Sequence, residues 1–438
     1  MKIYKFGGTS VGKPERMKSI AQLIDGEDNK VVVLSALSGV TNALVRICEA
    51  SQQKSPKTAA EEIDALKKHH LNFIEELYNN PESLKKAFEY IDKQFALVST
   101  LSLSEKFGDK EEKIILAQGE LLSTFIFYTY LEEIGLSAAL ISALDFMKIN
   151  AQEEPVLKYI EHNLMEALGR NPGKKLYITQ GYICRNAIGD IDNLKRGGSD
   201  YTASLLGAAL RAEEIQIWTD IDGMHNNDPR FVEGTFSIAE LSFDEAAELA
   251  YFGAKILHPA TIHPAKQYNI PVKLLNTMKP EARGTTICNS NDSHGSIKSI
   301  AAKDGIIAIK IKSSRMLMAY GFLRRVFEVF EKYKTPIDMI TTSEVAVSLT
   351  IDNLIHLDEI VMELQDFGTV EVDKDMSIVC VVGDFVSEKQ DMSFKVFDAL
   401  KKIPIRMISF GGSRHNISLL ISTPYKKEAL NLLNERLF

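Results

Sequence analysis

The sequence of 438 residues has few cysteines and no large excess of either charge. Its four cysteines, Cys48, Cys184, Cys288 and Cys380, are far apart and form no CxxC pair, which argues against a disulfide framework or a zinc knuckle. Lys and Arg total 51 against 59 Asp and Glu, a formal charge of −8 without a long run of one sign. Nucleic acid and membrane surfaces are therefore not expected as partners, and small molecules are.

Metal ligation and membrane insertion have equally little support. His258 and His263 lie five residues apart and would not share a helix face, so no protein metal site is expected. No apolar stretch approaches the roughly 20 residues needed to span a bilayer, and the N-terminus enters a strand without the regions of a signal peptide. We expect a cytoplasmic protein.

A chain of this length is too long for one hydrophobic core, so two or three domains are expected. The first part alternates short β-branched segments with helical patterns, which indicates an α/β domain with a largely parallel, covered sheet. The predicted strands fall within residues 30–37, 138–146, 174–183, 214–221 and 270–275. Residues 55–134 have instead an amphipathic helical pattern whose apolar positions are most simply core.

A repeated unit follows from residue 297 onward. Residues 326–351 are echoed by residues 396–421, each a predicted helix, a Pro-Ile strand, a turn and a second strand. The first copy continues through a helix into a further strand, whereas the second ends on a helix with no strand left. Residues 296–303 are the candidate for its missing edge, so we expect the two copies to be interleaved.

The segment YKFGGTSVGKP, residues 4–14, resembles a P-loop except that Pro14 stands where a Ser or Thr would place a hydroxyl on Mg²⁺. Proline suits the first turn of a helix, so a helix is expected to begin at Pro14. The preceding residues then link a strand to a helix and offer an anion close backbone approach, hydroxyl donors and a helix N-terminus. The lysine of interest becomes Lys5, on the strand before the loop.

Several ordered motifs decide how this loop is interpreted. KFGGTS is followed by LSALSGVTN (34–42), AQGELLS (117–123), RGGSDYTA (196–203), TDIDGMHNNDPR (219–230), AKILHPAT (254–261) and NTMKPEARGTTI (276–287). Together they resemble the aspartate kinases of the amino-acid kinase family over nearly the full chain. The C-terminal repeat resembles the paired ACT regulatory domains of those enzymes.

The resemblance implies a three-layer α/β sandwich with a mainly parallel central sheet, followed by two interleaved α+β ferredoxin-like ACT domains. The implied domains are a kinase at 1–296, with a helical stretch at about 55–134, a first ACT domain at 297–376 and a second at 377–438. The chain ends at Phe438 without the homoserine dehydrogenase half of some relatives, so a monofunctional enzyme is expected.

The implied reaction is transfer of the γ-phosphoryl group of ATP, as its Mg²⁺ complex, to the side-chain carboxylate of L-aspartate. This acceptor, with a pKa near about 4, is already ionised, so the reaction needs positioning and cations rather than a general base. By resemblance, Lys5 meets the transferring group, Lys255 binds the nucleotide phosphates, and Asp200 orients the lysines and helps to place Mg²⁺. The implied phosphate and nucleotide contacts are Gly7, Gly8, Thr9, Ser10, Gly197, Gly198, Thr219, Asp220 and Arg230.

Two groups are expected to hold the rest of the aspartate molecule. Arg196 presents a planar fork suited to bidentate binding of the α-carboxylate, and Glu120 would take the α-ammonium. Further substrate contacts implied by the resemblance are Ser35, Thr41, Asn42 and Ser199. Within the nucleotide motif, Asn226 and Asn227 stand where the family often has a small hydroxyl residue.

Residues 316–345 most resemble the lysine-inhibited class of these enzymes. The implied effector contacts are Met316, Gly321, Phe322, Leu323, Asp338, Ser343 and Val345, with Asp338 pairing with an ammonium group. Ala319 and Pro336 stand where lysine-sensitive relatives can carry serines. ACT units commonly pair between chains, so a homodimer or a larger homo-oligomer is expected.

Two other functions remain open. One is a kinase for glutamate, acetylglutamate or a nucleotide, although such relatives generally lack the C-terminal repeat. The other is a non-catalytic amino-acid sensor. Lys5, Arg196, Asp200 and Lys255 argue against it, because a sensor has no need of phosphoryl-transfer lysines.

Overall fold

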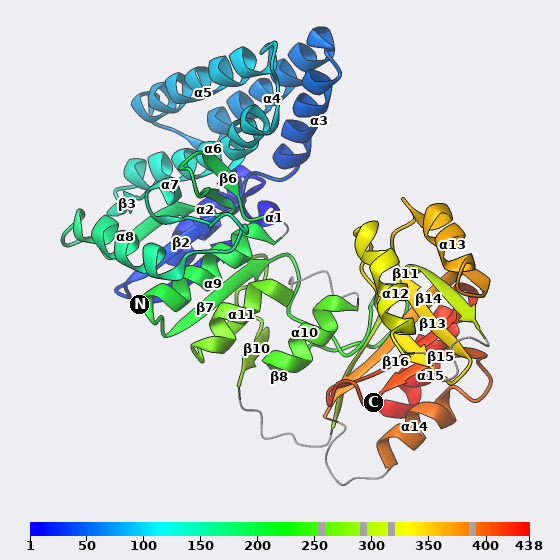
Figure 1. The fold of residues 1–438 in the computed structure, drawn as a ribbon. Helices are drawn as coiled ribbons and strands as arrows, with labels where there is room; N and C mark the ends of the chain where they lie inside the picture. Colours follow the sequence, from blue (N-terminus) through cyan, green and yellow to red (C-terminus); the bar gives the residue numbers. More distant parts are fainter. Residues whose placement is uncertain (196, 253–258, 290–295, 314–319, 385–390) are drawn as a thin grey trace. The chain divides into compact units, whose positions relative to one another are not determined.

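The computed structural model describes residues 1–195, 197–252, 259–289, 296–313, 320–384 and 391–438, and divides into two compact units (Figure 1). The first comprises residues 1–224, 239–243 and 257–290, and the second residues 225–238, 244–256 and 291–438. Two segments that precede residue 297 therefore fold with the C-terminal unit. The functional bounds expected at 296 and 376 stay a prediction.

A mainly parallel sheet forms the centre of the first unit. Its strands are β1 (Lys2–Phe6), β2 (Lys30–Leu34), β3 (Ala138–Leu140), β4 (Leu176–Gln180), β7 (Glu214–Thr219), β8 (Glu240–Ser242), β9 (Val272–Asn276) and β10 (Thr285–Cys288). They lie in the order β3-β4-β2-β1-β7-β9-β10-β8, and β10 is antiparallel to β9 whereas the strands from β3 to β9 are parallel. A separate hairpin joins β5 (Ile183–Arg185) to β6 (Ile191–Asn193). The predicted parallel sheet is confirmed.

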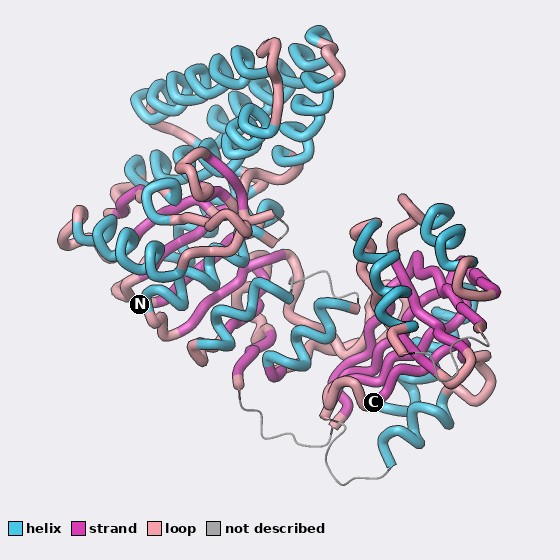
Figure 2. The backbone as a smooth tube through the Cα atoms, viewed as in Figure 1, coloured by secondary structure: helices cyan, strands magenta, loops and turns pink. Residues whose placement is uncertain are grey.

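Helices cover both faces of this sheet (Figure 2). They are α1 (Gly8–Val11), α2 (Pro14–Ile24), α3 (Val40–Gln52), α4 (Pro56–Leu77), α5 (Pro81–Ser102), α6 (Asp109–Glu133), α7 (Ala143–Phe146), α8 (Leu157–Gly169), α9 (Gly198–Leu210) and α11 (Pro259–Gln267). Tyr4 and Phe6 point into a core shared with α2, α3 and α6, whereas Ile3, one step along the strand, points to the face on which α9 packs. The three-layer sandwich is thereby confirmed, and α2 begins at Pro14 as predicted.

Helix α6 contradicts the expectation that no segment is long and apolar enough to cross a membrane. It passes that test on length and composition alone, but its apolar window is 78% buried inside the protein. The helix packs on β2, β3 and β4, so a core helix of the sandwich accounts for its composition.

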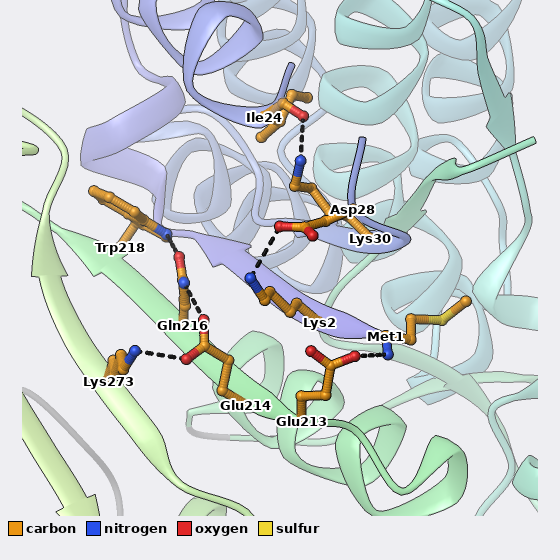
Figure 3. A network of polar contacts seen from close by, with 10 residues as sticks. All are labelled: Met1, Lys2, Ile24, Asp28, Lys30, Glu213, Glu214, Gln216, Trp218 and Lys273. Carbon is orange, nitrogen blue, oxygen red and sulfur yellow. Dashed lines mark hydrogen bonds and ion pairs between the residues drawn. The ribbon is translucent and has the colours of Figure 1, made fainter. Parts of the chain in front are cut away.

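Polar contacts hold the amino-terminal ends of the central strands (Figure 3). Lys2 of β1 pairs with Asp28 at 2.9 Å, and Glu214 of β7 pairs with Lys273 of β9 at 2.6 Å. Glu214 also accepts a hydrogen bond from the amide of Gln216. Such partly exposed pairs contribute at most about 1 kcal/mol each, so they fix strand ends more than they stabilise the fold. The carboxyl ends of the same strands carry the loops of the predicted site.

The second unit is built on a six-stranded antiparallel sheet. Its strands are β11 (Ile297–Lys312), β12 (Ile340–Thr342), β13 (Ala346–Ile351), β14 (Thr369–Gly383), β15 (Ile405–Phe410) and β16 (Asn416–Ser422), in the order β12-β13-β11-β14-β16-β15. Its helices are α10 (Phe243–Tyr251), α12 (Phe322–Lys332), α13 (Leu357–Gln365), α14 (Asp391–Ala399), the 3₁₀ turn η2 (Thr423–Tyr425) and α15 (Lys426–Leu437).

Strands β11 and β14 each serve both copies of the repeat. Residues 307–312 of β11 pair with β13 and with residues 369–373 of β14. Residues 297–303 pair instead with the second half of β14, which itself pairs with β16. The second copy therefore receives its missing edge from the predicted segment, and the interleaved pair of ferredoxin-like domains is confirmed.

Candidate active site

The loop after β1 packs directly against the loop after β2. Gly8 begins α1, and a Cβ atom at this position would lie 3.0 Å from the carbonyl oxygen of Ala36. Ser10 is fully buried, with its Oγ 2.7 Å from Oγ1 of Thr277 and 3.3 Å from the carbonyl oxygen of Trp218. Its hydroxyl thus ties the loop to β7 and to the end of β9, and the partly exposed residues of the loop are Gly7, Gly8 and Thr9.

An ion pair joins the end of β1 to the start of α9. Lys5 points to the same face of the sheet as Ile3, and its Nζ lies 2.6 Å from Oδ1 of Asp200, with the two side chains only 11% and 13% exposed. Gly197 precedes α9 with a φ of +68°, a left-handed conformation that glycine adopts without strain. The first turn of α9 presents backbone N–H groups of the kind that bind an anion at a helix N-terminus. A held cation and a helix N-terminus therefore meet at this position.

Glu120 on α6 is a buried acid, only 4% exposed. Burial raises the pKa of its carboxyl to about 8, although the N–H of Ala36, which donates to Oε1 at 3.2 Å, acts in the opposite direction. Ala36 also touches Gly8 through its carbonyl oxygen, so one residue links Glu120 to the loop after β1. The neighbouring Ser123 donates to the carbonyl oxygen of Ser35 at 2.7 Å, which fixes the loop after β2 on α6.

The remaining residues of the first unit that are predicted to contact substrate or nucleotide lie on loops and helix starts. Thr41 and Asn42 are exposed in the first turn of α3, and Thr219 donates to Asp220 at 3.2 Å directly after β7. Buried Gly198 leaves no room for a Cβ against Tyr182, and Gly181 leaves none against Ser199.

Three other predicted residues lie outside the described part of the first unit. Arg230 belongs to the second unit, where it is exposed and pairs with Asp228 at 2.6 Å. Arg196 and Lys255 lie outside the described residues. In the first unit the structure therefore connects Lys5, Asp200 and Glu120 through the glycine-rich loop.

The predicted effector residues lie in the first ACT domain, apart from Met316, which is outside the described residues. Gly321, with a φ of +77°, precedes α12, Phe322 is buried in the core beneath that helix, and Leu323 is partly exposed. Ser343 and Val345 form the exposed turn between β12 and β13 and border a cavity of 790 Å³.

Asp338 is the buried acid of this region, with its side chain 3% exposed. Its Oδ1 accepts hydrogen bonds from Nζ of Lys303 at 2.8 Å and from the hydroxyl of Tyr251 at 2.9 Å. Lys303 also pairs with Asp352 at 2.9 Å. The Oδ2 atom of Asp338 is buried without a hydrogen bond to any residue in the described part of the chain.

Sequence reasoning missed Ala36, Tyr182 and Lys303. Ala36 acts through its backbone groups, which no side-chain pattern reveals. Tyr182 adopts a φ of +65°, which is uncommon for a residue with a side chain, but nothing in its neighbourhood in the sequence indicates this. Lys303 and Asp338 are 35 residues apart, and only the fold of the second unit brings them together.

Within the residues that the structure describes, no three His, Cys, Asp or Glu side chains form a group that could hold a metal ion. Among the residues predicted to contact phosphate or nucleotide, or to help to place Mg²⁺, Asp200 and Asp220 carry carboxylates. Mg²⁺ is commonly held by one or two carboxylates together with substrate phosphates, so this donor set fits an ion carried by the nucleotide.

Comparison with known proteins shows which family of proteins this chain resembles. A model of the amino acid kinase family matches residues 1–276, and an ACT-domain model matches residues 379–437. The lysine-sensitive aspartokinase 3 of Escherichia coli is 34% identical over 453 residues, which cover 100% of this chain and 99% of that relative. The chain belongs to the aspartokinases of the amino acid kinase family.

Other aspartokinases agree with this assignment. The chloroplastic aspartokinase 1 of Arabidopsis thaliana is 33% identical over 463 residues, which cover 100% of this chain and 80% of the relative. The crystal structure of E. coli aspartokinase III with aspartate and ADP, an R-state, matches with a TM-score of 0.87 at 32% identity over 100% of both chains. The T-state of the same enzyme, with lysine and aspartate, matches with a TM-score of 0.84 at 33% identity over 100% of this chain and 99% of that one. The fold and the enzyme class of an aspartate kinase are thus established.

Proposed function

We propose that this aspartokinase transfers the γ-phosphoryl group of Mg-ATP to the side-chain carboxylate of L-aspartate, giving 4-phospho-L-aspartate, the first step toward the amino acids of the aspartate family. The ion pair of Lys5 and Asp200 at the N-terminus of α9 is the observation that carries the proposal. The similar E. coli enzyme has been crystallised with aspartate and ADP.

The geometry suits a reaction between two anions. The acceptor carboxylate is already ionised at neutral pH, so the barrier comes from bringing negative oxygens together. Nζ of Lys5 carries a positive charge, and Asp200 holds it at 2.6 Å before any substrate arrives. A preoriented cation stabilises the charge of the transition state without reorganisation. Mg²⁺ bound to the ATP phosphates would neutralise further charge, with Asp200 and Asp220 as the carboxylates that could reach it.

Recognition of aspartate follows from its remaining two charges. We assign the α-ammonium to Glu120, because a buried carboxyl with a raised pKa gains most from a cationic partner. Arg196, outside the described residues, is assigned to the α-carboxylate, and Ser35, Thr41, Asn42 and Ser199 to further contacts. Lys255, also outside the described residues, is assigned to the nucleotide phosphates.

Regulation is assigned to L-lysine at the first ACT domain. Oδ2 of Asp338 is a buried acceptor without a hydrogen bond in the described structure, and such an atom favours a ligand that carries N–H donors. An effector ammonium could bind there while Lys303 and Tyr251 keep Oδ1. The similar E. coli enzyme has been crystallised with lysine. Effector and substrate would then favour different states of the enzyme.

The assembly, location and functional bounds are part of the same proposal. The three residues of β12 are exposed at the edge of the six-stranded sheet, which favours pairing of ACT domains in a homodimer or larger assembly. We place the enzyme in the cytoplasm and assign residues 1–296 to catalysis, 297–376 to effector binding and 377–438 to the second ACT domain.

The test is ADP release by purified protein from Mg-ATP with L-aspartate, with glutamate and acetylglutamate as alternative acceptors, each with and without millimolar L-lysine or L-threonine. We expect turnover with aspartate alone, suppressed by lysine. Turnover that lysine does not affect would keep the kinase and refute the effector assignment. Amino-acid binding without turnover would indicate a sensor and refute the catalytic proposal.

A matched pair of variants tests the assigned chemistry. Lys5→Met removes the cation that Asp200 holds, whereas Lys2→Met, on the same strand, removes the ion pair with Asp28. We expect the first to abolish most turnover and the second to retain it. Equal losses would show that β1 needs its lysines for folding rather than for phosphoryl transfer.

A further inference from the structure

The nucleotide motif, residues 219–230, does not fold as one piece. Residues up to Met224 belong to the first compact unit, and the segment from His225 to Ile238 belongs to the second. The loop that follows β7 therefore continues into the unit that contains the two ACT domains. The contacts of its second half show which part of that unit holds it.

Two buried asparagines attach this segment to α15, the last helix of the chain. Asn226 is 0% exposed and Asn227 is 2% exposed. Their side-chain amides donate to the same atom, Oδ1 of Asn434, at 3.2 Å and 3.3 Å. Asn227 also donates to the carbonyl oxygen of Leu430 at 3.1 Å. One side-chain oxygen of α15 thus receives both amides of the loop.

The acceptor oxygens of the same two asparagines shape the segment itself. Oδ1 of Asn226 accepts a hydrogen bond from the backbone N–H of Phe236 at 2.9 Å, and Oδ1 of Asn227 accepts one from the N–H of Asp228 at 2.9 Å. The carbonyl oxygen of Asn226 accepts from Ile300 of β11 at 2.8 Å. Each amide therefore uses its donor on α15 and its acceptor within the loop.

Apolar and cationic contacts extend the same attachment. Val232 is 3% exposed and belongs to the core of the second ACT domain, with Leu430 and Leu433 of α15. Nζ of Lys426 lies 3.9 Å from the centre of the Phe231 ring, within the range of a cation–π contact. The segment is therefore anchored along α15 from its first turn to its last.

We infer that Asn226, Asn227 and Asn434 are positioning residues for ATP, through which the terminal helix of the second ACT domain holds the nucleotide loop. Arg230, which the sequence analysis assigns to the nucleotide, lies within the anchored segment, so its position depends on these contacts. The second ACT domain then supports ATP binding independently of effector binding in the first. The inference rests on the proposed function, because it takes the motif to be a nucleotide loop.

The test compares three substitutions on neighbouring positions of α15. Asn434→Leu keeps the size of the side chain but removes the oxygen that accepts both amides, and Asn434→Asp retains such an oxygen. Glu435→Ala, at an exposed position of the same helix, is the control. Because two hydrogen bonds to buried amides are lost, we expect Asn434→Leu to raise the KM for ATP about five- to tenfold and to leave the KM for aspartate unchanged. Asn434→Asp and Glu435→Ala should stay within about twofold of the parent.

The outcomes separate this inference from the proposed function. Absence of aspartate-dependent turnover in the parent protein would refute the proposed function. In that case, titration of the parent and the variants with Mg-ATP compares their dissociation constants for ATP in place of the KM values. If the parent turns over, the inference is overturned by an Asn434→Leu variant that melts at lower temperature but keeps the parental KM for ATP. The amides would then serve folding alone. If Asn434→Leu does not fold, Asn227→Ser, which shortens the donor side chain, takes its place with the same expected rise.

Discussion

The raised pKa of Glu120 predicts a specific pH dependence of aspartate binding. The carboxyl is held at a pKa of about 8 because its burial on α6 outweighs the hydrogen bond that the Ala36 N–H donates to it. An ammonium group pairs with the carboxylate form. Binding of aspartate below pH 8 must therefore release a proton from Glu120, and the apparent affinity must rise with pH.

The magnitude follows from the ionised fraction. With a pKa of about 8, that fraction is roughly 1% at pH 6, about a tenth at pH 7 and half at pH 8. The KM for aspartate should therefore fall about fiftyfold between pH 6 and pH 8 and level off above, while the substrate keeps its ammonium charge. The KM for ATP, measured in the same assays at saturating aspartate, provides the reference because Glu120 is not assigned to the nucleotide.

The matched variant is Glu120→Gln, which keeps the shape and the hydrogen-bond acceptor but cannot ionise. We expect a raised KM for aspartate whose dependence on pH between 6 and 8 is lost. A parent enzyme with a flat profile would refute the raised pKa, and a variant that keeps the slope would assign the titration to another group.

The same group makes a second, opposite contribution to folding. Because its pKa is higher in the folded state than in the unfolded chain, where it is near 4.3, the stability it contributes is full below about pH 4 and is lost as the pH rises to about 8. Without substrate, Glu120→Gln should therefore stabilise the protein at pH 8 relative to the parent by up to about 4 kcal/mol, and hardly at all at pH 4.5. Chemical denaturation at the two pH values measures this difference, and an equal effect at both would contradict it.

Three further substitutions test the remaining assignments. Lys5→Met should lower kcat by about a hundredfold or more, because a preoriented cation is lost from the transition state, and steady-state kinetics that show only a raised KM would contradict this role. Arg196→Lys should raise the KM for aspartate far more than the KM for ATP, since lysine cannot form the bidentate contact, and equal effects would remove Arg196 from it. Tyr251→Phe removes a hydrogen bond to Asp338 and should lower the lysine concentration for half-inhibition about three- to tenfold; an unchanged value in the inhibition assay would place the effector elsewhere.

Much of the fold could be predicted because its signals are local. The alternation of β-branched segments and helical patterns indicated a parallel sheet, and β2, β4, β7 and β9 lie where it predicted strands. Counting the strands of the repeat was enough to predict that residues 296–303 would complete the second ACT domain, because a sheet edge left unpaired is unfavourable. Helix α6 belongs to the helical stretch whose apolar positions were expected to be core, and its burial agrees with this, although its length and composition alone would also suit a membrane span.

The sequence by itself determined the chemistry available to this protein: the lysines, the acids and the glycine-rich turns in their order. Only the tertiary structure decided which of them act together. Lys5 meets Asp200 because β1 lies under α9, and Glu120 acquires its raised pKa because α6 is buried. The nucleotide motif is divided between two units because Asn226 and Asn227 find their partner, Asn434, about 200 residues further along the chain. Contacts over such distances depend on how whole elements pack, and that information is spread over both units rather than written in any one motif.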